Sequence, residues 1–252
     1  MDCKFKKVCK KFNKSQCDTE CFPYIVLHGT TGIGGYWGQR RTPKRYDNSF
    51  LETLPIEKEN PKAYNVVSKY SKDPLGYALD KRVGLFLYSI PNKENKLGTG
   101  TGKTTSAITI LNEFLIARVK QNLENGLDLK DCPVLFIKLS ELQNIFNAQF
   151  RGVRELQEES ARKYYMLKKR MMSVELLVID DIGVRDLSDV FKNELFEIID
   201  TRATEEVTTI YTSNYPLEKL NEFLGERTVS RIDGMTYKVG FEGKDARKGG
   251  LF

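Results

Sequence analysis

A run of glycine and threonine residues near the middle of the chain has the composition of a loop that binds nucleotide phosphates. The run occupies consecutive positions: Gly98, Thr99, Gly100, Thr101, Gly102, Lys103, Thr104 and Thr105. Glycines allow successive backbone N–H groups to point into one concavity at the positive end of a helix. Lys103 supplies a mobile charge for the β- and γ-phosphates, and Thr104 places a hydroxyl on Mg²⁺. These residue types predict a site for a nucleotide with its magnesium ion.

The segments on either side of this run support the same interpretation. The apolar stretch 83–89 before it predicts a buried strand, and apolar residues recur at helical spacing from Ala107 to Leu115 after it. A Gly/Thr-rich turn with a solvated lysine is the alternative, but it does not explain a strand followed by a helix. The usual pattern places glycine where this chain has Leu97, so the path into the loop is not defined by the pattern.

A second predicted strand ends in paired carboxylates. The apolar residues 176–179 run directly into Asp180 and Asp181. At the carboxyl edge of a parallel sheet, Asp180 can bind the Mg²⁺ that Thr104 also faces, and Asp181 can orient or deprotonate an attacking water. A strand-to-turn Asp-Asp pair without a ligand is the alternative. Glutamate is more usual as the base, and the shorter side chain of Asp181 predicts slower hydrolysis.

Polar and cationic side chains follow the next predicted strand. The strand 206–213 ends at Asn214, whose amide could bridge the attacking water and the γ-phosphate, although strand ends often carry such turn-forming residues. Arg227 and Arg231 are one helical turn apart, so they would project from one face of a helix. Such a pair either forms a solvated basic face or reaches an anion.

From residue 83 onward, predicted strands alternate with predicted helices, which indicates an α/β domain with a parallel sheet and helices on both faces. Strands are expected at 83–89, 133–139, 174–180, 206–213 and 235–241. Helices are expected at 103–120, 140–150, 155–172, 187–202 and 216–232. Ser140 and Gln143 have the spacing of a capping box at the start of the second helix.

The first part of the chain differs in composition from the rest. It contains four of the five cysteines, a glycine-rich turn region and loops marked by proline. We therefore expect a small module over residues 1–75 and the α/β domain over 76–252. Little regular structure is expected before about residue 60, followed by a short helix around residues 64–70.

The clustered cysteines suggest a metal site. They are Cys3, Cys9, Cys17 and Cys21. In a reducing cytosol, such clusters more often bind a tetrahedral metal than form disulfides. Their spacing is not that of a standard zinc ribbon or finger, and His28, the only histidine, could replace one thiolate. Reduced cysteines that pack as small hydrophobic side chains are the alternative to structural Zn²⁺.

Composition indicates a soluble, cytoplasmic protein. The chain has 252 residues, of which 40% are hydrophobic and 29% charged. No apolar run is long enough to cross a membrane, and the beginning of the chain has no signal-peptide core. The net charge of +6 is compatible with a polyanionic partner but does not establish one.

Four segments together resemble AAA+ helicase loaders of the bacterial DnaC and DnaI type, including phage-encoded versions. They are GTGTGKTT, LLVIDDIG, TIYTSNYPLEKL and LGERTVSRIDGM, in the order in which the family has them. The resemblance covers about residues 80–252. It implies an ATPase that uses ATP and Mg²⁺, binds single-stranded DNA and delivers the hexameric DnaB-type replicative helicase when DNA replication starts. Alternatives with the same core are IstB-type transposition helper ATPases and a replication adaptor that binds ATP without hydrolysing it.

The resemblance also assigns roles to residues of the nucleotide site. Lys103 and Thr104 match the Walker A pair, and Asp180 and Asp181 match the Walker B pair. Asn214 matches the sensor 1 residue. These matches imply that the phosphate loop and the ends of two strands together bind ATP and its Mg²⁺.

Two arginines match arginines that act on the nucleotide in this family, and a third precedes one of them. Arg231 matches the arginine finger that reaches the nucleotide of a neighbouring subunit, Arg227 precedes it, and Arg247 matches the sensor 2 arginine. A cation supplied in trans stabilises charge on the transferring γ-phosphoryl group, which implies self-association through the nucleotide interface. Few residues follow Phe241, too few for the C-terminal helical lid of most AAA+ proteins.

A segment with mixed aromatic and cationic side chains is the candidate for contact with single-stranded DNA. Its members are Phe150, Arg151, Arg154, Arg162, Lys163, Tyr164, Tyr165, Lys168 and Lys169. An ordinary exposed helix with a packed apolar face is the alternative. Loaders of the DnaI type dock on the helicase through an N-terminal domain that binds zinc, but the cysteine spacing here does not align with that domain.

Overall fold

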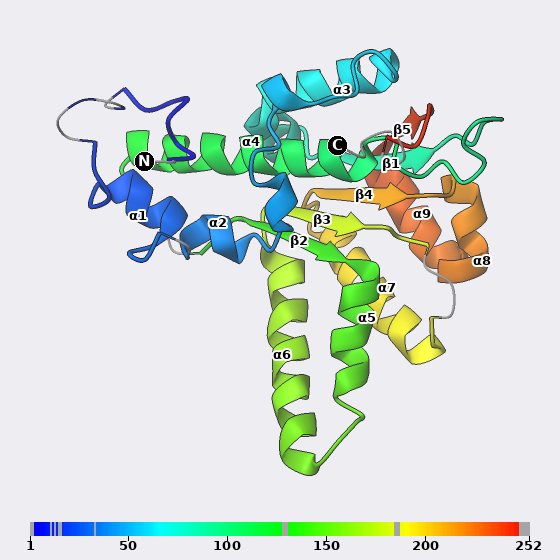
Figure 1. Ribbon diagram of the computed structural model, residues 1–252. Coiled ribbons are helices and arrows are strands. Elements are labelled where there is room, and N and C mark those ends of the chain that lie inside the picture. Colours follow the sequence, from blue (N-terminus) through cyan, green and yellow to red (C-terminus); the bar gives the residue numbers. More distant parts are fainter. Residues whose placement is uncertain are drawn as a thin grey trace.

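A parallel sheet forms the centre of the computed structural model, which describes residues 3–10, 12, 14, 17–32, 34–127, 131–183 and 187–246. Within these residues the sheet has five strands in the order β2-β3-β4-β1-β5 (Figure 1). The strands are β1 (Gly84–Ser89), β2 (Val134–Lys138), β3 (Leu176–Asp180), β4 (Thr209–Ser213) and β5 (Thr236–Phe241). The prediction of a parallel sheet is confirmed.

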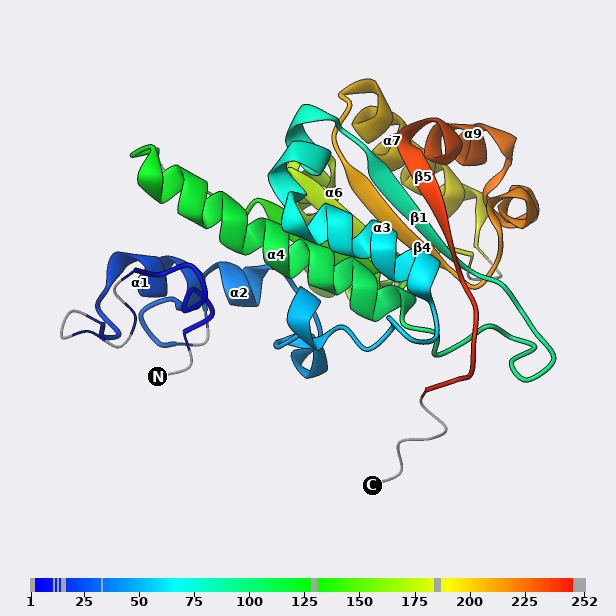
Figure 2. The ribbon, with the colours of Figure 1, turned by 90° about the horizontal axis from the view of Figure 1, so that it is seen from above.

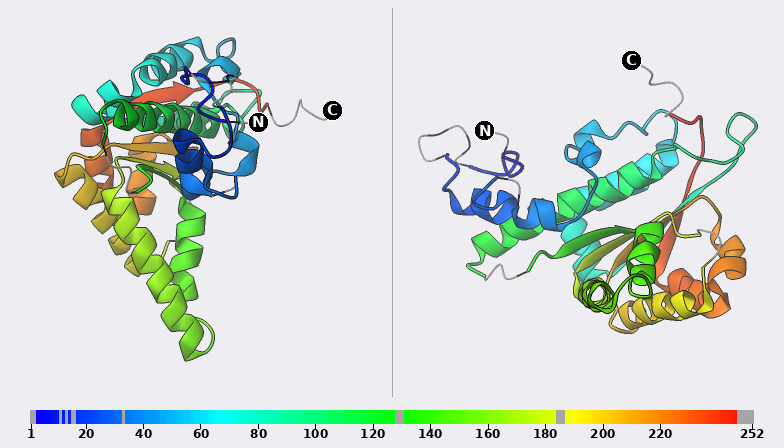
Figure 3. Two further views of the ribbon diagram at one scale, coloured as in Figure 1. Left: turned by 90° about the vertical axis from the view of Figure 1, so that its left-hand side faces the viewer. Right: turned by 60° about the horizontal axis from the view of Figure 1, so that its bottom comes forward.

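Helices cover both faces of the sheet. They are α1 (Phe22–His28), α2 (Gly35–Gln39), α3 (Pro61–Lys72), α4 (Lys103–Glu124), α5 (Leu139–Ala148), α6 (Arg154–Ser173), α7 (Asp189–Thr204), α8 (Asn221–Leu224) and α9 (Glu226–Met235). α3 and α4 lie on one face, and α5, α6, α7 and α9 lie on the other (Figures 1 and 2). α5 and α6 pack side by side and project together beyond the sheet as an arm (Figure 3).

The strands β1 to β4 are mostly apolar because both of their faces are buried, as parallel sheets require, whereas Tyr237 and Lys238 of the edge strand β5 are exposed. Successive side chains point to opposite faces, so β1 to β4 each contribute to two hydrophobic clusters, whereas β5 contributes buried residues to one. In β2, Val134 and Phe136 join the cluster under α4, whereas Leu135 and Ile137 join the cluster under α5 and α6. The continuous apolar runs that predicted the strands are therefore explained by burial on two sides.

The segment before the sheet packs on the same cluster as α4. Leu27 of α1 and Trp37 of α2 are buried in that cluster, and Trp37 stacks on Phe50. The N–H group of Phe136 in the edge strand β2 donates to the carbonyl of Arg40 at 2.8 Å. The prediction of little regular structure before residue 60 missed α1 and α2, whereas the helix expected around residues 64–70 is α3. The division of the chain at residue 75 stays a prediction.

The start of α5 differs from its prediction. The helix begins at Leu139, directly after β2, and Lys138 at its N-cap makes no side-chain capping hydrogen bond. Ser140 therefore lies inside the first turn, and the predicted capping box is wrong. The strand runs into the helix without a loop, so the chain has no position where a capping serine would precede the first turn.

A buried arginine joins the ends of three elements. Arg202 of α7 is fully buried, and burial lowers its pKa to about 10. Its guanidinium donates to the carbonyls of Met171 at 2.7 Å, Val174 at 2.9 Å and Thr208 at 2.5 Å, and to the Thr209 hydroxyl at 2.7 Å. These bonds attach the end of α6 and the start of β4 to α7, which fixes the strand that carries Asn214.

Candidate nucleotide-binding site

The glycine-rich run forms the connection between β1 and α4. Gly98, Gly100 and Gly102 have φ values of +60°, +70° and +98°, a region that favours glycine. A Cβ atom on Gly98 would lie 2.4 Å from Cβ of Ser89, and one on Gly102 would lie 2.4 Å from Cγ2 of Ile56. Glycine is therefore required at both positions by conformation and by space.

The residues predicted to bind the nucleotide lie together at the N-terminus of α4. Gly98, Thr99, Gly100, Thr101 and Gly102 form the loop, and Lys103, Thr104 and Thr105 form the first turn of the helix. Lys103 is buried, and its Nζ donates to Ser89 Oγ at 2.6 Å and to the Gly98 carbonyl at 3.1 Å. The ammonium group thus lies inside the loop, beside the helix N-terminus that attracts anions.

One carboxylate oxygen connects three elements of the site. Oδ1 of Asp180, at the end of β3, accepts from the Thr104 hydroxyl at 2.7 Å and from the Thr212 hydroxyl at 2.8 Å. The same Thr212 hydroxyl accepts from the Asp181 N–H at 2.9 Å. A hydroxyl and a carboxylate of this kind are oxygen ligands that Mg²⁺ accepts alongside water and phosphates, so Thr104 and Asp180 fit the ion.

Asp181 leaves the strand in an unusual conformation. Its φ is +61°, which costs energy for a residue other than glycine and is often found at functional sites. The turn directs the carboxylate towards β4, where Oδ1 accepts from Asn214 Nδ2 at 3.0 Å. The structure therefore brings together the two residues predicted to position an attacking water.

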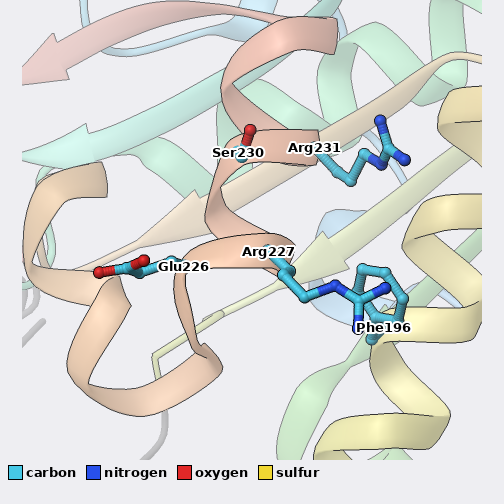
Figure 4. Close-up of a pocket in the computed structure, with 5 residues that line it drawn as sticks. All are labelled: Phe196, Glu226, Arg227, Ser230 and Arg231. Atoms are coloured by element: carbon cyan, nitrogen blue, oxygen red, sulfur yellow. The ribbon is translucent and has the colours of Figure 1, made fainter.

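Arg227 and Arg231 lie away from the phosphate loop, in a small cavity between α7 and α9 (Figure 4). The Arg227 guanidinium lies 4.6 Å from the centre of the Phe196 ring, and Arg231 Nε donates to Asp200 Oδ1 at 2.6 Å. The cavity has a volume of about 300 Å³ and includes Ser230. These helices cover the opposite face of the sheet from α4 (Figure 1). The two arginines thus form a separate cationic group.

The last described residues lie against the phosphate loop. The Thr99 hydroxyl donates to Asp245 Oδ2 at 2.9 Å, and the Ala246 N–H donates to the Gly100 carbonyl at 3.2 Å. Arg247, the predicted sensor 2 residue, lies outside the described residues.

The structure gives no support for the predicted zinc site at the N-terminal cysteines. Cys3, Cys9, Cys17 and Cys21 are all free thiols. Burial is the main factor that raises the pKa of Cys3, and the other three thiols add to the shift, so the protonated form is favoured. His28 Nε2 accepts from the Lys4 N–H at 3.1 Å, and its ring stacks on Tyr24. Among the described residues no group of three or more His, Cys, Asp or Glu side chains is placed to bind a metal.

Most of the residues predicted to contact DNA are exposed on the arm. Two of them are not available: Tyr164 is buried and donates to Glu194 at 3.0 Å, and Lys168 pairs with Glu194 and Glu197, each at 2.7 Å. These contacts attach α6 to α7. The exposed members of the predicted set are Phe150, Arg151, Arg154, Arg162, Lys163, Tyr165 and Lys169.

Sequence reasoning missed three residues that position the site. Ser89 binds the Lys103 ammonium, Thr212 orients both aspartates, and Asp200 pairs with Arg231. Thr212 lies next to Asp180 because the strands pair in the register Ile179 with Tyr211. Only strand pairing identifies Thr212, since a threonine in a strand carries no signal of its own.

Among the described residues, no helix combines the length and apolar character needed to cross a membrane.

A family model described as IstB-like ATP binding protein matches residues 142–236. A curated relative named replicative helicase loader DnaC, from Buchnera aphidicola subsp. Baizongia pistaciae, is 27% identical over 74% of this chain and 64% of its own length. The protein of the same name from Escherichia coli K12 is 29% identical over 53% of this chain and 46% of its own. This chain therefore spans less than two thirds of either relative.

Solved structures with a similar fold include those of DnaC, DnaI and DnaA. A crystal structure of the DnaC helicase loader has a TM-score of 0.55 at 24% identity, covering 79% of this chain and 99% of that one. DnaI has a TM-score of 0.55 at 18% identity, covering 80% and 95% of the two chains. AMPPCP-bound DnaA from Aquifex aeolicus has a TM-score of 0.53 at 20% identity, over 79% and 50%. These likenesses show that the sheet and its helices have the AAA+ fold. The family model, the curated relatives and the solved structures together confirm the resemblance to AAA+ helicase loaders of the DnaC and DnaI type.

Proposed function

We propose that the protein is an AAA+ ATPase that loads a hexameric replicative helicase onto single-stranded DNA. The observation that carries the ATPase part is the shared carboxylate oxygen of Asp180, which contacts the Walker A hydroxyl of Thr104. Lys103 lies inside the adjoining loop, and Asp181 with Asn214 lies at the same edge of the sheet. This arrangement supports binding of ATP with Mg²⁺ and attack by a positioned water.

Each residue has a defined task in this proposal. The loop N–H groups bind the phosphates, and Lys103 leaves Ser89 to contact the β- and γ-phosphates. Thr104 and Asp180 hold Mg²⁺, which when bound neutralises charge on the phosphate oxygens. Asp181 orients and deprotonates the water, with Asn214 fixing the carboxylate.

The cationic cavity supports a role for neighbouring subunits. Arg231, assisted by Arg227, leaves Asp200 and reaches the nucleotide of an adjacent copy, where it stabilises the γ-phosphoryl group in the transition state. The resemblance also assigns Arg247 to the nucleotide of its own subunit. Hydrolysis then depends on self-association.

The partners follow from the relatives and from the arm. The curated relatives are named replicative helicase loaders, which supports the helicase as partner. The exposed aromatic residues Phe150 and Tyr165 and the cations Arg151 and Arg154 of the arm would contact single-stranded DNA by stacking and charge. The segment 1–75 would dock on the helicase, and residues 76–252 would form the ATPase domain.

One experiment tests the central assignment. A tagged form of the full chain is mixed with a hexameric replicative helicase, with ATP or without it, and the complex is isolated. Recovery of the helicase that requires ATP, and that is lost with Lys103→Ala, supports the proposal. Absence of helicase from the purified complex under all conditions contradicts it.

The match to the IstB-like family model favours one alternative, a helper ATPase that delivers DNA to a transposase. Parallel isolation with a transposase distinguishes the two partners. A nucleotide-gated adaptor without hydrolysis is the remaining alternative. Phosphate release measured with and without single-stranded DNA separates it from an ATPase.

A further inference from the structure

A large groove lies at the base of the arm, away from the nucleotide site. Its volume is about 1070 Å³, and it is bounded by the end of α2, the residues just before β2 and one side of α5 and α6. The strand order places β2 at the edge of the sheet, on the far side of β3 and β4 from β1, which leads into the phosphate loop. A groove of this size is large enough for a ligand or a peptide side chain with its flanking residues.

The groove has an apolar floor and a basic rim. Ile145, Leu167 and Val174 contribute apolar surface, and Met166 lies at the opening with 63% of its surface exposed. Among the described residues that line the groove, five are arginine or lysine and two are aspartate or glutamate. An exposed methionine beside an apolar floor is a surface that adapts to partner side chains.

Two of the cations are available to a partner. Arg170 donates to the Val134 carbonyl at 3.1 Å, and Arg41 pairs with Glu141. Lys163 pairs with Glu159 at 2.6 Å, so these three cations are used within the fold. Arg162 and Lys169 are exposed and have no carboxylate within hydrogen-bonding distance among the described residues. They lie on the same side of α6, two turns apart, with Met166 between them.

We propose that this groove binds an acidic peptide segment of a partner protein, with carboxylates on Arg162 and Lys169 and an apolar side chain against Met166 and Leu167. Charge complementarity selects carboxylates, and the apolar floor selects a hydrophobic anchor between them. This binding surface goes beyond the loader assignment, since it requires neither ATP nor the cationic cavity between α7 and α9.

A nucleic acid fits the groove less well than a peptide. No aromatic side chain is found among the described residues that line it, so bases would have no stacking surface there. The aromatic residues of the arm, Phe150 and Tyr165, are not among the lining residues.

The test begins with an unbiased probe. The full chain is immobilised and used to select from a phage-displayed library of random dodecapeptides, with the double variant Arg162→Glu/Lys169→Glu as the counter-target. The expected result is enrichment, on the unaltered chain alone, of peptides that carry Asp or Glu on both sides of an apolar residue. No enrichment over the double variant overturns the proposal.

A selected peptide is then synthesised with a fluorescein label, and its affinity is measured by anisotropy. We expect the double variant to bind about tenfold more weakly or worse, because two ion pairs become repulsive. Met166→Ser is expected to bind about threefold more weakly, because apolar contact is lost without any change of charge. The control Lys62→Glu/Lys69→Glu makes the same change of net charge on α3, across the sheet, and should bind like the unaltered chain.

Each other outcome counts against the proposal. Equal binding by Met166→Ser, or equal weakening in the α3 control, means that the peptide is attracted only by net charge. If a labelled twenty-nucleotide oligothymidylate loses affinity in Arg162→Glu/Lys169→Glu while the peptide does not, the groove binds DNA. All of the substituted side chains are exposed, and circular dichroism and thermal melting confirm that the variants fold.

Discussion

Thr212 is the residue whose replacement most directly tests how the site is built. Its hydroxyl donates to Asp180 and accepts from the Asp181 N–H, so one oxygen positions both aspartates. Valine has almost the same shape as threonine but carries no hydroxyl. Thr212→Val therefore removes both hydrogen bonds without leaving a cavity in β4.

The magnitude follows from the two bonds. A hydrogen bond to a charged carboxylate contributes about 1.5–3 kcal/mol, and an N–H left without its partner adds to the loss. Thr212 is 2% exposed, so water cannot easily replace the hydroxyl, although Asp180 keeps its bond to Thr104. We expect unfolding to become easier by about 2–3 kcal/mol and the melting temperature to fall by about 5–10 °C. Because the hydroxyl supports the magnesium ligand, ATP turnover should fall about 10–100-fold.

The assay pairs urea unfolding with phosphate release, and the control is Thr212→Ser. Serine keeps the hydroxyl and loses only a methyl group, so it should retain most of the stability and turnover. The reasoning is refuted if Thr212→Val unfolds and turns over ATP like the unaltered chain, or if serine and valine are equally damaging.

Other predictions concern binding, assembly and stability. Lys103→Ala should abolish ATP binding in titration calorimetry, because the ammonium inside the loop is lost; heat equal to that of the unaltered chain would contradict this. Arg231→Ala should leave ATP binding intact but remove the part of the turnover that rises with protein concentration, and a variant that keeps this rise would exclude the finger role. Asp200→Asn, which weakens the hold on Arg231, should increase concentration-dependent phosphate release up to about fivefold, since an exposed ion pair contributes at most about 1 kcal/mol; an unchanged rate would show that Asp200 does not restrain Arg231. Arg202→Met should destabilise the fold by about 3–5 kcal/mol in urea unfolding, because four buried acceptors lose their donor, and Arg202→Lys should recover part of this. A methionine variant as stable as the unaltered chain would refute the bonding role.

Elements with a strong local pattern were predictable. The strands β1 to β4 were found because apolar runs bounded by turn residues reflect burial on both faces. The phosphate loop was found because its glycines, Lys103 and Thr104 are adjacent in the chain. The predicted capping box at Ser140 was wrong for a physical reason. β2 continues directly into α5, so Ser140 has the spacing of a capping box but does not lie at the N-cap.

Contacts between distant segments were not predictable. Tyr164 and Lys168 have the composition of a DNA-binding surface, yet Glu194 of α7 binds both of them. α1 and α2 lack a long periodic pattern and are stabilised by packing against α4 and the β2 edge rather than by propensity. The pairing of Arg231 with Asp200 likewise depends on how α9 lies against α7.

The sequence by itself determined that the chain is an α/β protein with a phosphate loop, paired aspartates at a strand end and a pair of arginines one helical turn apart. Those features depend only on residues that are close together in the sequence. The backbone geometry of a helix or strand fixes how such residues lie relative to one another. Only the tertiary structure decided the strand order, which places Thr212 beside Asp180 and Asn214 beside Asp181. It also decided which cations are exposed, because burial and pairing depend on side chains that pack together from distant parts of the sequence.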